Sequence, residues 1–193
     1  MEQIQAKKKS AIADIDRGIY DLKNEFTYSL KSDKGLNEAI VREISKNKNE
    51  PDWVLERRLK SLEIFEKTEN PPWGPDLSGF DIDEITTYIR PKATLANNWD
   101  TLPEDIRNTF DVLGIPEAEK EKLAGVGAQY DSEEVYHSVK DYLKEQGVIY
   151  TDFDAAIRDY PEIVKKYFQK AIPPTLHKYA ALHGAVFSGG SFV

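Results

Sequence analysis

The sequence contains no cysteine among its 193 residues. This absence excludes disulfides, thiolate nucleophiles and every cysteine-ligated metal or cluster site within the chain. Long apolar runs are also missing, since no stretch approaches the roughly 20 residues that a helix needs to cross a bilayer. A basic cluster at residues 7–9 is followed by acidic residues, where a signal peptide would need its apolar stretch. We therefore expect a soluble cytoplasmic protein with no membrane partner.

Positive charge is scarce as well. The formal net charge is −8, and the three lysines at 7–9 form the only basic run. Phosphate binding needs a net basic surface, so this balance argues against a nucleic-acid partner. The hydrophobic fraction of 40% is nevertheless enough to bury a core. The length fits one compact domain, or one domain with an appendage.

Residues 1–34 read as an N-terminal amphipathic arm and a linker. Apolar residues recur there at spacings of three and four: Ile12, Ile15, Ile19, Leu22 and Phe26. This stripe is typical of a helix that docks its apolar side on a core, and it is too short to identify a coiled coil. Gly18 falls inside the stripe and weakens it. Residues 27–35 are polar, end in a glycine and predict a linker.

Residues 35–66 predict a helical hairpin. Asn37 is placed to cap a first helix, which carries Ile40, Val41 and Ile44 on its apolar face. Pro51 then suits the first turn of a second helix over 52–66. The second helix places four apolar residues on one face, which are Leu55, Leu59, Leu62 and Phe65. On another face Glu56 and Lys60 are spaced four apart for an ion pair.

The middle of the chain is less regular. Three prolines and two glycines make 69–81 a loop, which we expect Trp73 to fix to the core. Residues 84–89 predict a short strand or extended arm that closes at Pro91. Two helices should follow, the first from Pro103 with Ile106, Phe110 and Leu113 on one face and Gly114 as its stop. The second should run over 116–123 and pack its end tightly at 125–128.

The last third predicts more helices and two short strands. Asp131 and Glu134 resemble a capping box for a helix that buries Val135, Val139 and Tyr142 and ends at Gly147. A strand over 148–150 precedes a helix that Thr151 could cap and that runs to about Asp159. Further helices are expected from Pro161 and over 175–185. Residues 187–193, FSGGSFV, read as a glycine turn that enters a strand.

No group of residues predicts a catalytic, cofactor-binding or metal site. The glycines at 125–127 lack the strand-turn-helix frame and the Lys-Ser/Thr pair of a phosphate loop. His177 and His183 are six apart, which does not place two ligands on one helical face, and His137 stands alone. Ser188–Ser191 lacks the glycine arrangement of a nucleophile elbow.

Acidic clusters and tryptophans have structural explanations too. Two acidic groups, at 81–84 and 152–154, are better explained as charges at helix N-termini than as catalytic or calcium-binding carboxylates. Trp53 and Trp73 each lie close to prolines. They are more often core or loop contacts than anchors for a partner, although exposed tryptophan is a frequent hot spot. We therefore expect a protein that is not an enzyme.

Two long strings carry a family resemblance. The first is NEPDWVLERRL (49–59) and the second is AGVGAQYDSE (124–133 with Glu134 following). With EQGVIY (145–150), DYPEIVKKYF (159–168) and IPP (172–174), they resemble the N-terminal region of the SufB type within the SufB/SufD family, the scaffold proteins of the SUF iron–sulfur cluster assembly system. The resemblance runs from about residue 35 to 193. It departs at Asp52, where glutamate is usual, and at Phe187, where tryptophan is common.

The resemblance implies an organisation and a role. It implies a mainly α (α+β) chain with short strands: an arm at 1–34, a helical SufB-type domain at 35–170, and at 171–193 a connector that enters the first strand of a right-handed parallel β-helix, whose continuation is missing. It implies scaffold function in iron–sulfur cluster assembly with the SufC ATPase and with SufD or a second SufB. The family's cluster-binding and ATPase-contacting positions match no residue here, so no cofactor is expected on this chain. A SufD-like paralogue, or a stand-alone helical interaction module, remains the alternative.

Overall fold

The computed structural model describes residues 28–73, 76–77, 79–92, 101–112, 125–139 and 141–193. Three of the sequence-based expectations lie outside these residues: the apolar stripe at 12–26, the helix over 116–123, and the helix stop at 113–114. Helices dominate the described part, and its strands are short. Among the described residues no helix is long and apolar enough to cross a membrane.

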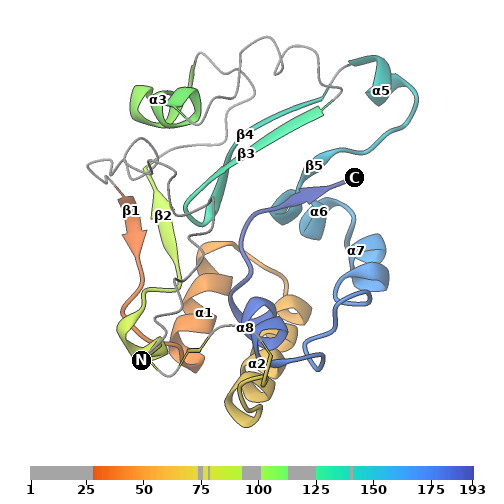
Figure 1. Cartoon of the computed structure of the whole chain (residues 1–193). Coiled ribbons are helices and arrows are strands. Elements are labelled where there is room, and N and C mark those ends of the chain that lie inside the picture. Colours follow the sequence, from red (N-terminus) through yellow and green to blue (C-terminus); the bar gives the residue numbers. More distant parts are fainter. Residues whose placement is uncertain (1–27, 74–75, 78, 93–100, 113–124, 140) are drawn as a thin grey trace, which may run out of the picture.

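The predicted helical hairpin is confirmed. Helix α1 spans Glu38–Asn47, and its N-cap Asn37 accepts a hydrogen bond from the backbone N–H of Ile40. Helix α2 spans Asp52–Lys67 and follows Pro51, whose φ of −68° suits a helix start. The two helices pack together, and helix α8, Lys178–Val186, lies along α2 (Figure 1). These three helices form the base of the molecule.

The buried face of α2 is rotated from the predicted one. Leu62 and Phe65 are buried as expected, whereas Leu55 and Leu59 are only partly buried. Val54, Arg58 and Ser61 occupy the most enclosed positions instead. The spacing of apolar residues could not predict this face, because two of its three residues are polar. Arg58 and Ser61 are buried with their polar groups hydrogen-bonded. Lys60 pairs with Glu63 at 2.7 Å, three residues on, rather than with Glu56.

Three two-stranded antiparallel sheets lie among the described residues. Strand β1, Tyr28–Lys31, falls within the predicted linker and pairs with β2, Ile89–Pro91. The extended arm predicted over 84–89 is largely confirmed: the 3-10 turn η2, Ile82–Glu84, takes only its first residue, Thr86 forms an antiparallel bridge with Lys34, and the strand itself is confined to β2. Asp81 caps η2 by accepting the N–H of Asp83 at 2.9 Å.

The largest correction concerns residues 125–139. The predicted helix from the Asp131–Glu134 box is wrong: strands β3, Gly125–Tyr130, and β4, Glu133–Val139, form a hairpin. Val135 and Val139 are four apart, a spacing that keeps two residues on one face of a helix and of a strand alike. Asp131 holds the turn with a φ of +52°, a left-handed conformation that aspartate tolerates better than most residues. Only the short helix α5, Asp141–Glu145, follows before the stop at Gly147.

Helix α3, Glu104–Val112, starts after Pro103 as predicted and buries Ile106. It covers one face of the hairpin in a small separate core with Leu102, Ala128 and Val135. Figure 1 shows α3 and the hairpin together above the helical base. The hairpin thus contributes Ala128 and Val135 to this cluster.

The C-terminal third surrounds the chain's last described residues. Helix α6, Phe153–Asp159, ends as predicted, whereas α7, Pro161–Tyr167, begins at the predicted proline but ends before the prolines at 173–174. The cap of α6 is Asp152, not Thr151, and strand β5 is Thr151–Asp152 rather than 148–150. Strand β6, Ser191–Phe192, pairs with β5, so this segment folds back within the chain. A parallel β-helix beyond this strand stays a prediction.

Candidate functional site

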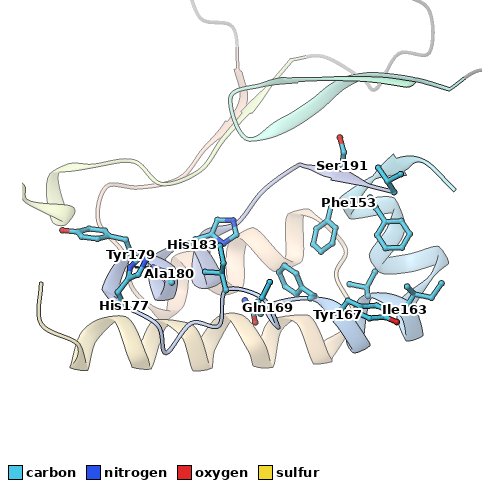
Figure 2. A pocket seen from close by; sticks show the side chains of 15 residues that line it. Phe153, Ile163, Tyr167, Gln169, His177, Tyr179, Ala180, His183 and Ser191 are labelled. Atoms are coloured by element: carbon cyan, nitrogen blue, oxygen red, sulfur yellow. Dashed lines mark hydrogen bonds between the residues drawn. The ribbon is translucent and has the colours of Figure 1, made fainter. Parts of the chain in front are cut away.

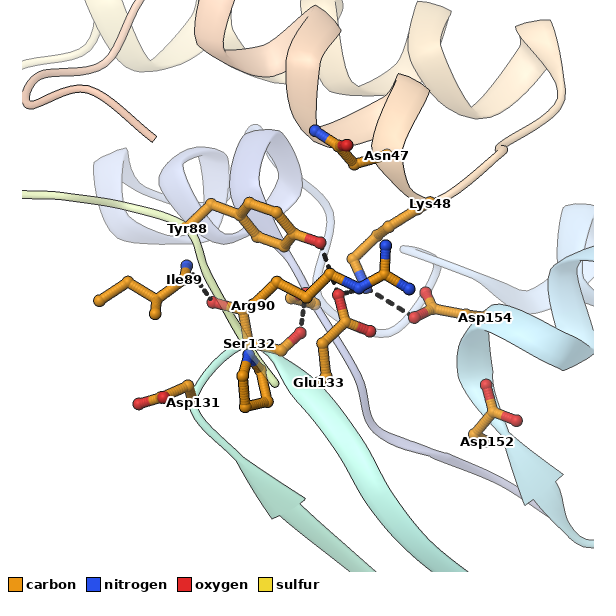
Figure 3. Close-up of polar contacts among 12 residues, drawn as sticks. Asn47, Lys48, Tyr88, Ile89, Arg90, Asp131, Ser132, Glu133, Asp152 and Asp154 are labelled. Atoms are coloured by element: carbon orange, nitrogen blue, oxygen red, sulfur yellow. Dashed lines mark hydrogen bonds and ion pairs between the residues drawn. The ribbon is translucent and has the colours of Figure 1, made fainter. Parts of the chain in front are cut away.

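Four polar side chains from four elements meet under the turn of the hairpin. Lys48, directly after α1, has a side chain only 1% exposed, with its Nζ 2.6 Å from Asp154 Oδ2 and 3.4 Å from Glu133 Oε1. Tyr88 donates its hydroxyl hydrogen to the same Glu133 oxygen at 2.5 Å. Figure 3 shows these side chains converging from α1, α6, β4 and the segment before β2. We call Lys48, Tyr88, Glu133 and Asp154 the lysine cluster.

The electrostatics of the lysine cluster favour a structural role. Burial raises the pKa of Tyr88 above its usual value, and the hydrogen bond to Glu133 raises it further. The phenol therefore stays protonated and remains a donor. Lys48 is satisfied by two carboxylates, and removing either would leave a poorly compensated buried charge. Asp154 Oδ1 is a buried oxygen with no hydrogen-bond partner among the described residues.

The turn of the hairpin also binds backbone on both sides. Ser132 accepts the N–H of Ile89 at its Oγ, 3.0 Å away, and donates its own N–H to the Ile89 carbonyl at 3.1 Å. On the other side, Ser188 donates its hydroxyl hydrogen to the carbonyl of Ser132, and Gln129 donates its amide to the carbonyl of Ser188 at 3.3 Å. The hairpin is thus fixed to β2 and to the segment 187–191.

A second buried ion pair joins α2 to the same segment. Arg58 is fully buried and binds both carboxylate oxygens of Glu50, at 2.5 and 2.8 Å. Its remaining donors reach the carbonyls of Ala185 at 3.0 Å and Phe187 at 2.9 Å. Its guanidinium carbon lies 3.7 Å from the centre of the Phe187 ring. This fork geometry needs arginine, because lysine offers a single point of charge.

An apolar groove of about 800 Å³ opens between α7, α8 and β6. Its walls include side chains that are largely exposed: Ile163 at 41%, Tyr167 at 62%, Ile172 at 63% and Val193 at 83%. Figure 2 shows these walls, with Phe153 and His183 facing the same space. No aspartate or glutamate lines the groove. Exposed apolar side chains gathered in a hollow are typical of a binding surface.

The histidines weighed from the sequence do not meet at a metal site. His177 caps α8, where its Nδ1 accepts the N–H of Ala180 at 3.1 Å. Burial and the charge of Arg58 lower the pKa of His183. The side chain of His137 lies outside the described part of the chain. Within that part, no three histidine or acidic residues are grouped to hold a metal ion.

The tryptophans and the other weighed residues have separate positions. Trp53 is partly buried on the core, and the guanidinium of Arg57 lies over its ring at 5.1 Å. Trp73 is 61% exposed and makes a T-shaped contact with the His177 ring, with the ring centres 5.2 Å apart, so it is not inserted into the core as predicted. Asp81 and Asp152 cap helical turns, which confirms the explanation of the acidic groups as helix N-terminal charges.

Comparison with known proteins gives the chain its relatives. No family model matches it. It is 48% identical over 188 residues to an iron–sulfur cluster assembly SufBD family protein of Staphylococcus aureus (strain USA300). It is also 48% identical over 192 residues to an iron–sulfur cluster assembly SufBD family protein of Mycobacterium bovis. These matches cover 97% and 99% of this chain, but only 40% and 23% of the relatives.

These findings define a mainly helical protein whose described residues include two buried groups of paired charges: the lysine cluster and the Glu50–Arg58 ion pair. Over almost its whole length it is homologous to proteins of the SufBD family, which supports the SufB/SufD resemblance of the sequence. Both relatives are named as SufBD family proteins, which does not separate SufB from SufD.

Proposed function

We propose that this chain forms the N-terminal part of a SufB-type scaffold for iron–sulfur cluster assembly. It would act in the cytoplasm, within a complex with the SufC ATPase and SufD, and would not itself be catalytic. The observation that carries the proposal is the 48% identity that extends over 97% of the chain to a SufBD family protein. The relatives are much longer, so we propose that the cluster is built on parts of the scaffold outside these 193 residues.

The residues that carry the resemblance support an architectural role. The string at 49–59 contains the buried ion pair of Glu50 and Arg58, and Arg58 also donates to the carbonyls of residues 185 and 187. The string at 124–134 contains strand β3 and the turn of the hairpin, and its Gln129 and Ser132 contact Ser188. Both strings therefore act on one short C-terminal segment. We infer that the domain's task is to hold and orient this segment for the rest of a scaffold.

A chimera tests the proposal. The homologous region of the staphylococcal SufBD protein would be replaced by this chain in cells that depend on the SUF system. We expect the chimera to co-purify with SufC and SufD and to restore the activity of an iron–sulfur enzyme such as aconitase. A deletion of the same region serves as the negative control. A well-expressed chimera that behaves like the deletion would contradict the proposal.

The same design addresses the SufD-like alternative and the position of the cluster. Restoration only when the chain replaces the N-terminal part of SufD, and not of SufB, would favour the paralogue. The isolated chain is expected to bind no cluster after anaerobic reconstitution with iron and sulfide, because it has no cysteine. A visible absorption band with stoichiometric iron and acid-labile sulfide would contradict that part of the proposal.

A further inference from the structure

The apolar groove carries an inference beyond the scaffold role. Its walls contain exposed side chains on two segments: Ile163 and Tyr167 on α7, and Ile172 in the loop that follows. A small-molecule site usually buries most of the surface of its ligand. In this groove the exposed walls would leave much of a small ligand in contact with solvent. A protein segment can cover such walls with its own side chains. The geometry therefore favours a peptide occupant.

The charges around the groove indicate the chemistry of that occupant. Residues 161–183, which supply most of the walls, contain four lysines and one glutamate, in a chain whose net charge is −8. Two of the lysines have partners within the chain: Lys165 pairs with Glu162 at 3.0 Å, and Lys178 donates to the Thr68 carbonyl at 2.9 Å. Lys166 and Lys170 are exposed. The apolar groove is thus flanked by exposed lysines, although the protein as a whole is acidic.

Lys166 and Lys170 lie next to the apolar walls. The Lys166 ammonium is 4.9 Å from the centre of the Tyr167 ring, and Lys170 lies in the sequence between the lining residues Gln169 and Ala171. A partner that places apolar side chains in the groove would bring the residues flanking those side chains close to these two lysines. Opposite charge on those flanking residues would steer the encounter and fix its orientation.

From this arrangement we propose that the groove binds an amphipathic helix whose apolar face is flanked by acidic residues. An amphipathic helix in a groove is a common mode of peptide recognition, with anchors spaced three and four apart. The complementary charge selects an acidic partner over a basic one. The groove would give the domain a docking point for a second protein on the side of the molecule away from α3.

A pair of fluorescent peptides tests the proposal on the isolated chain. Both carry leucines at helical spacing, and their polar faces are either all glutamate or all lysine. Fluorescence anisotropy should show saturable binding of the glutamate peptide, at least tenfold tighter than the lysine peptide, and weaker binding at high salt. Equal binding of the two peptides, or no binding of either, would overturn the proposal.

Two variants place the interaction at the groove. Ile172→Ser removes an exposed wall residue and should weaken the glutamate peptide about tenfold, whereas the matched control Val112→Ser, at a 44% exposed position on α3, should not. The double charge reversal Lys166→Glu with Lys170→Glu should weaken the glutamate peptide and tighten the lysine peptide. Unchanged affinities in these groove variants, or displacement of the bound peptide by the fatty acid laurate, would overturn the proposal. The peptide assay uses the isolated chain and no other Suf protein. Its failure would therefore count against the groove proposal alone, whereas failure of the chimera would count against the scaffold role.

Discussion

At the level of single residues, the packing of α8 on α2 depends on Gly184, which has no side chain. A Cβ built on Gly184 would lie 2.5 Å from Ser61 Oγ, 2.9 Å from Ser61 Cβ and 3.0 Å from Gln169 Nε2. Ser61 is itself buried and donates its hydroxyl hydrogen to the carbonyl of Arg57 at 2.8 Å. Ser61 cannot move away without losing this hydrogen bond, whereas the amide nitrogen of Gln169 has no hydrogen-bond partner to lose. The close approach of these helices therefore requires glycine at position 184.

Gly184→Ala should destabilise the fold, although alanine is the better helix former. Alanine gains roughly 0.5–1 kcal/mol over glycine inside a helix, whereas overpacking a tight contact costs about 1–3 kcal/mol. The clash should win, which gives a net loss of about 1–2 kcal/mol in a urea denaturation. Gly79→Ala is the control, since nothing lies within 4 Å of its added Cβ. Equal stability of Gly184→Ala and the wild type would mean that the helices separate freely.

His183 should make stability depend on pH in the acidic range. Its folded pKa is lowered from 6.5 by burial and by Arg58, so the unfolded chain takes up a proton more readily. The unfolded state then binds more protons as the pH falls below about 6.5, and stability declines until the folded pKa is passed. His183→Gln should therefore lose less stability than the wild type between pH 7 and pH 5. Parallel stability curves from urea melts at each pH would contradict this sign.

Among the helices, α2 shows how local periodicity and tertiary packing can disagree. Leu62 is 5% exposed and belongs to the cluster of Val41 and Ala185, whereas Leu59 packs at the edge of the same cluster. Their spacing in the sequence places both leucines on one face of the helix. In the structure Leu62 is buried, whereas Leu59 is only partly buried.

Leu62→Ala should cost about 2–5 kcal/mol, the range for a fully buried leucine. Leu59→Ala removes the same atoms from a partly exposed position, so its loss should be smaller. Urea melts of the two variants provide the comparison, because side-chain chemistry and helix are matched. A larger loss for Leu59→Ala would show that the face predicted from apolar spacing is the true core face.

Local signals predicted the helices well, because their evidence lies within a few residues. Asn37 as a cap and Pro161 as a helix start are examples that the structure confirms. The hairpin over 125–139 escaped prediction because valines four apart fit both a helix and a strand. Its turn depends on Asp131 in a left-handed conformation, which aspartate can adopt but does not signal.

The buried polar clusters could not be predicted from local pattern. Lys48 and Asp154 are 106 residues apart in the chain, and Arg58 reaches a carbonyl 129 residues away. Neither Lys48 nor Arg58 belongs to an apolar pattern, and nothing beside them in the sequence indicates a partner this distant. Only the fold brings their partners near. The groove was missed for the same reason, since its walls come from α6, α7, α8 and β6.

In the whole molecule, these long-range contacts converge on the C-terminal segment. Arg58 binds the carbonyl of Phe187, Gln129 binds that of Ser188, and β5 pairs with Ser191 and Phe192. The segment is thus held by α2, by the hairpin and by the strand before α6. Strand β6 therefore has its partner strand within the same chain. A scaffold that continues past this point would emerge from a fixed position.

Hydrogen exchange tests whether β6 folds back within a single chain. The N–H of Phe153 donates to the carbonyl of Gly190 at 2.8 Å, so it is protected only while β6 is in place. The N–H of Ala155 donates to Asp152 Oδ1 at 2.8 Å and does not need β6, which makes it an internal control. Phe192 stacks on Tyr160 with ring centres 6.0 Å apart, and this contact helps to hold the strand.

We expect the amide of Phe153 to exchange slowly and at a rate that does not change on dilution, because its partner belongs to the same chain. Phe192→Ala should speed exchange at Phe153 while leaving Ala155 nearly unchanged, since loss of the ring loosens β6 before it affects the cap of α6. Nuclear magnetic resonance at two protein concentrations measures both amides at once. Faster exchange at Phe153 in the more dilute sample would mean that a second copy supplies the partner strand, and that the C-terminal segment is not held by its own chain.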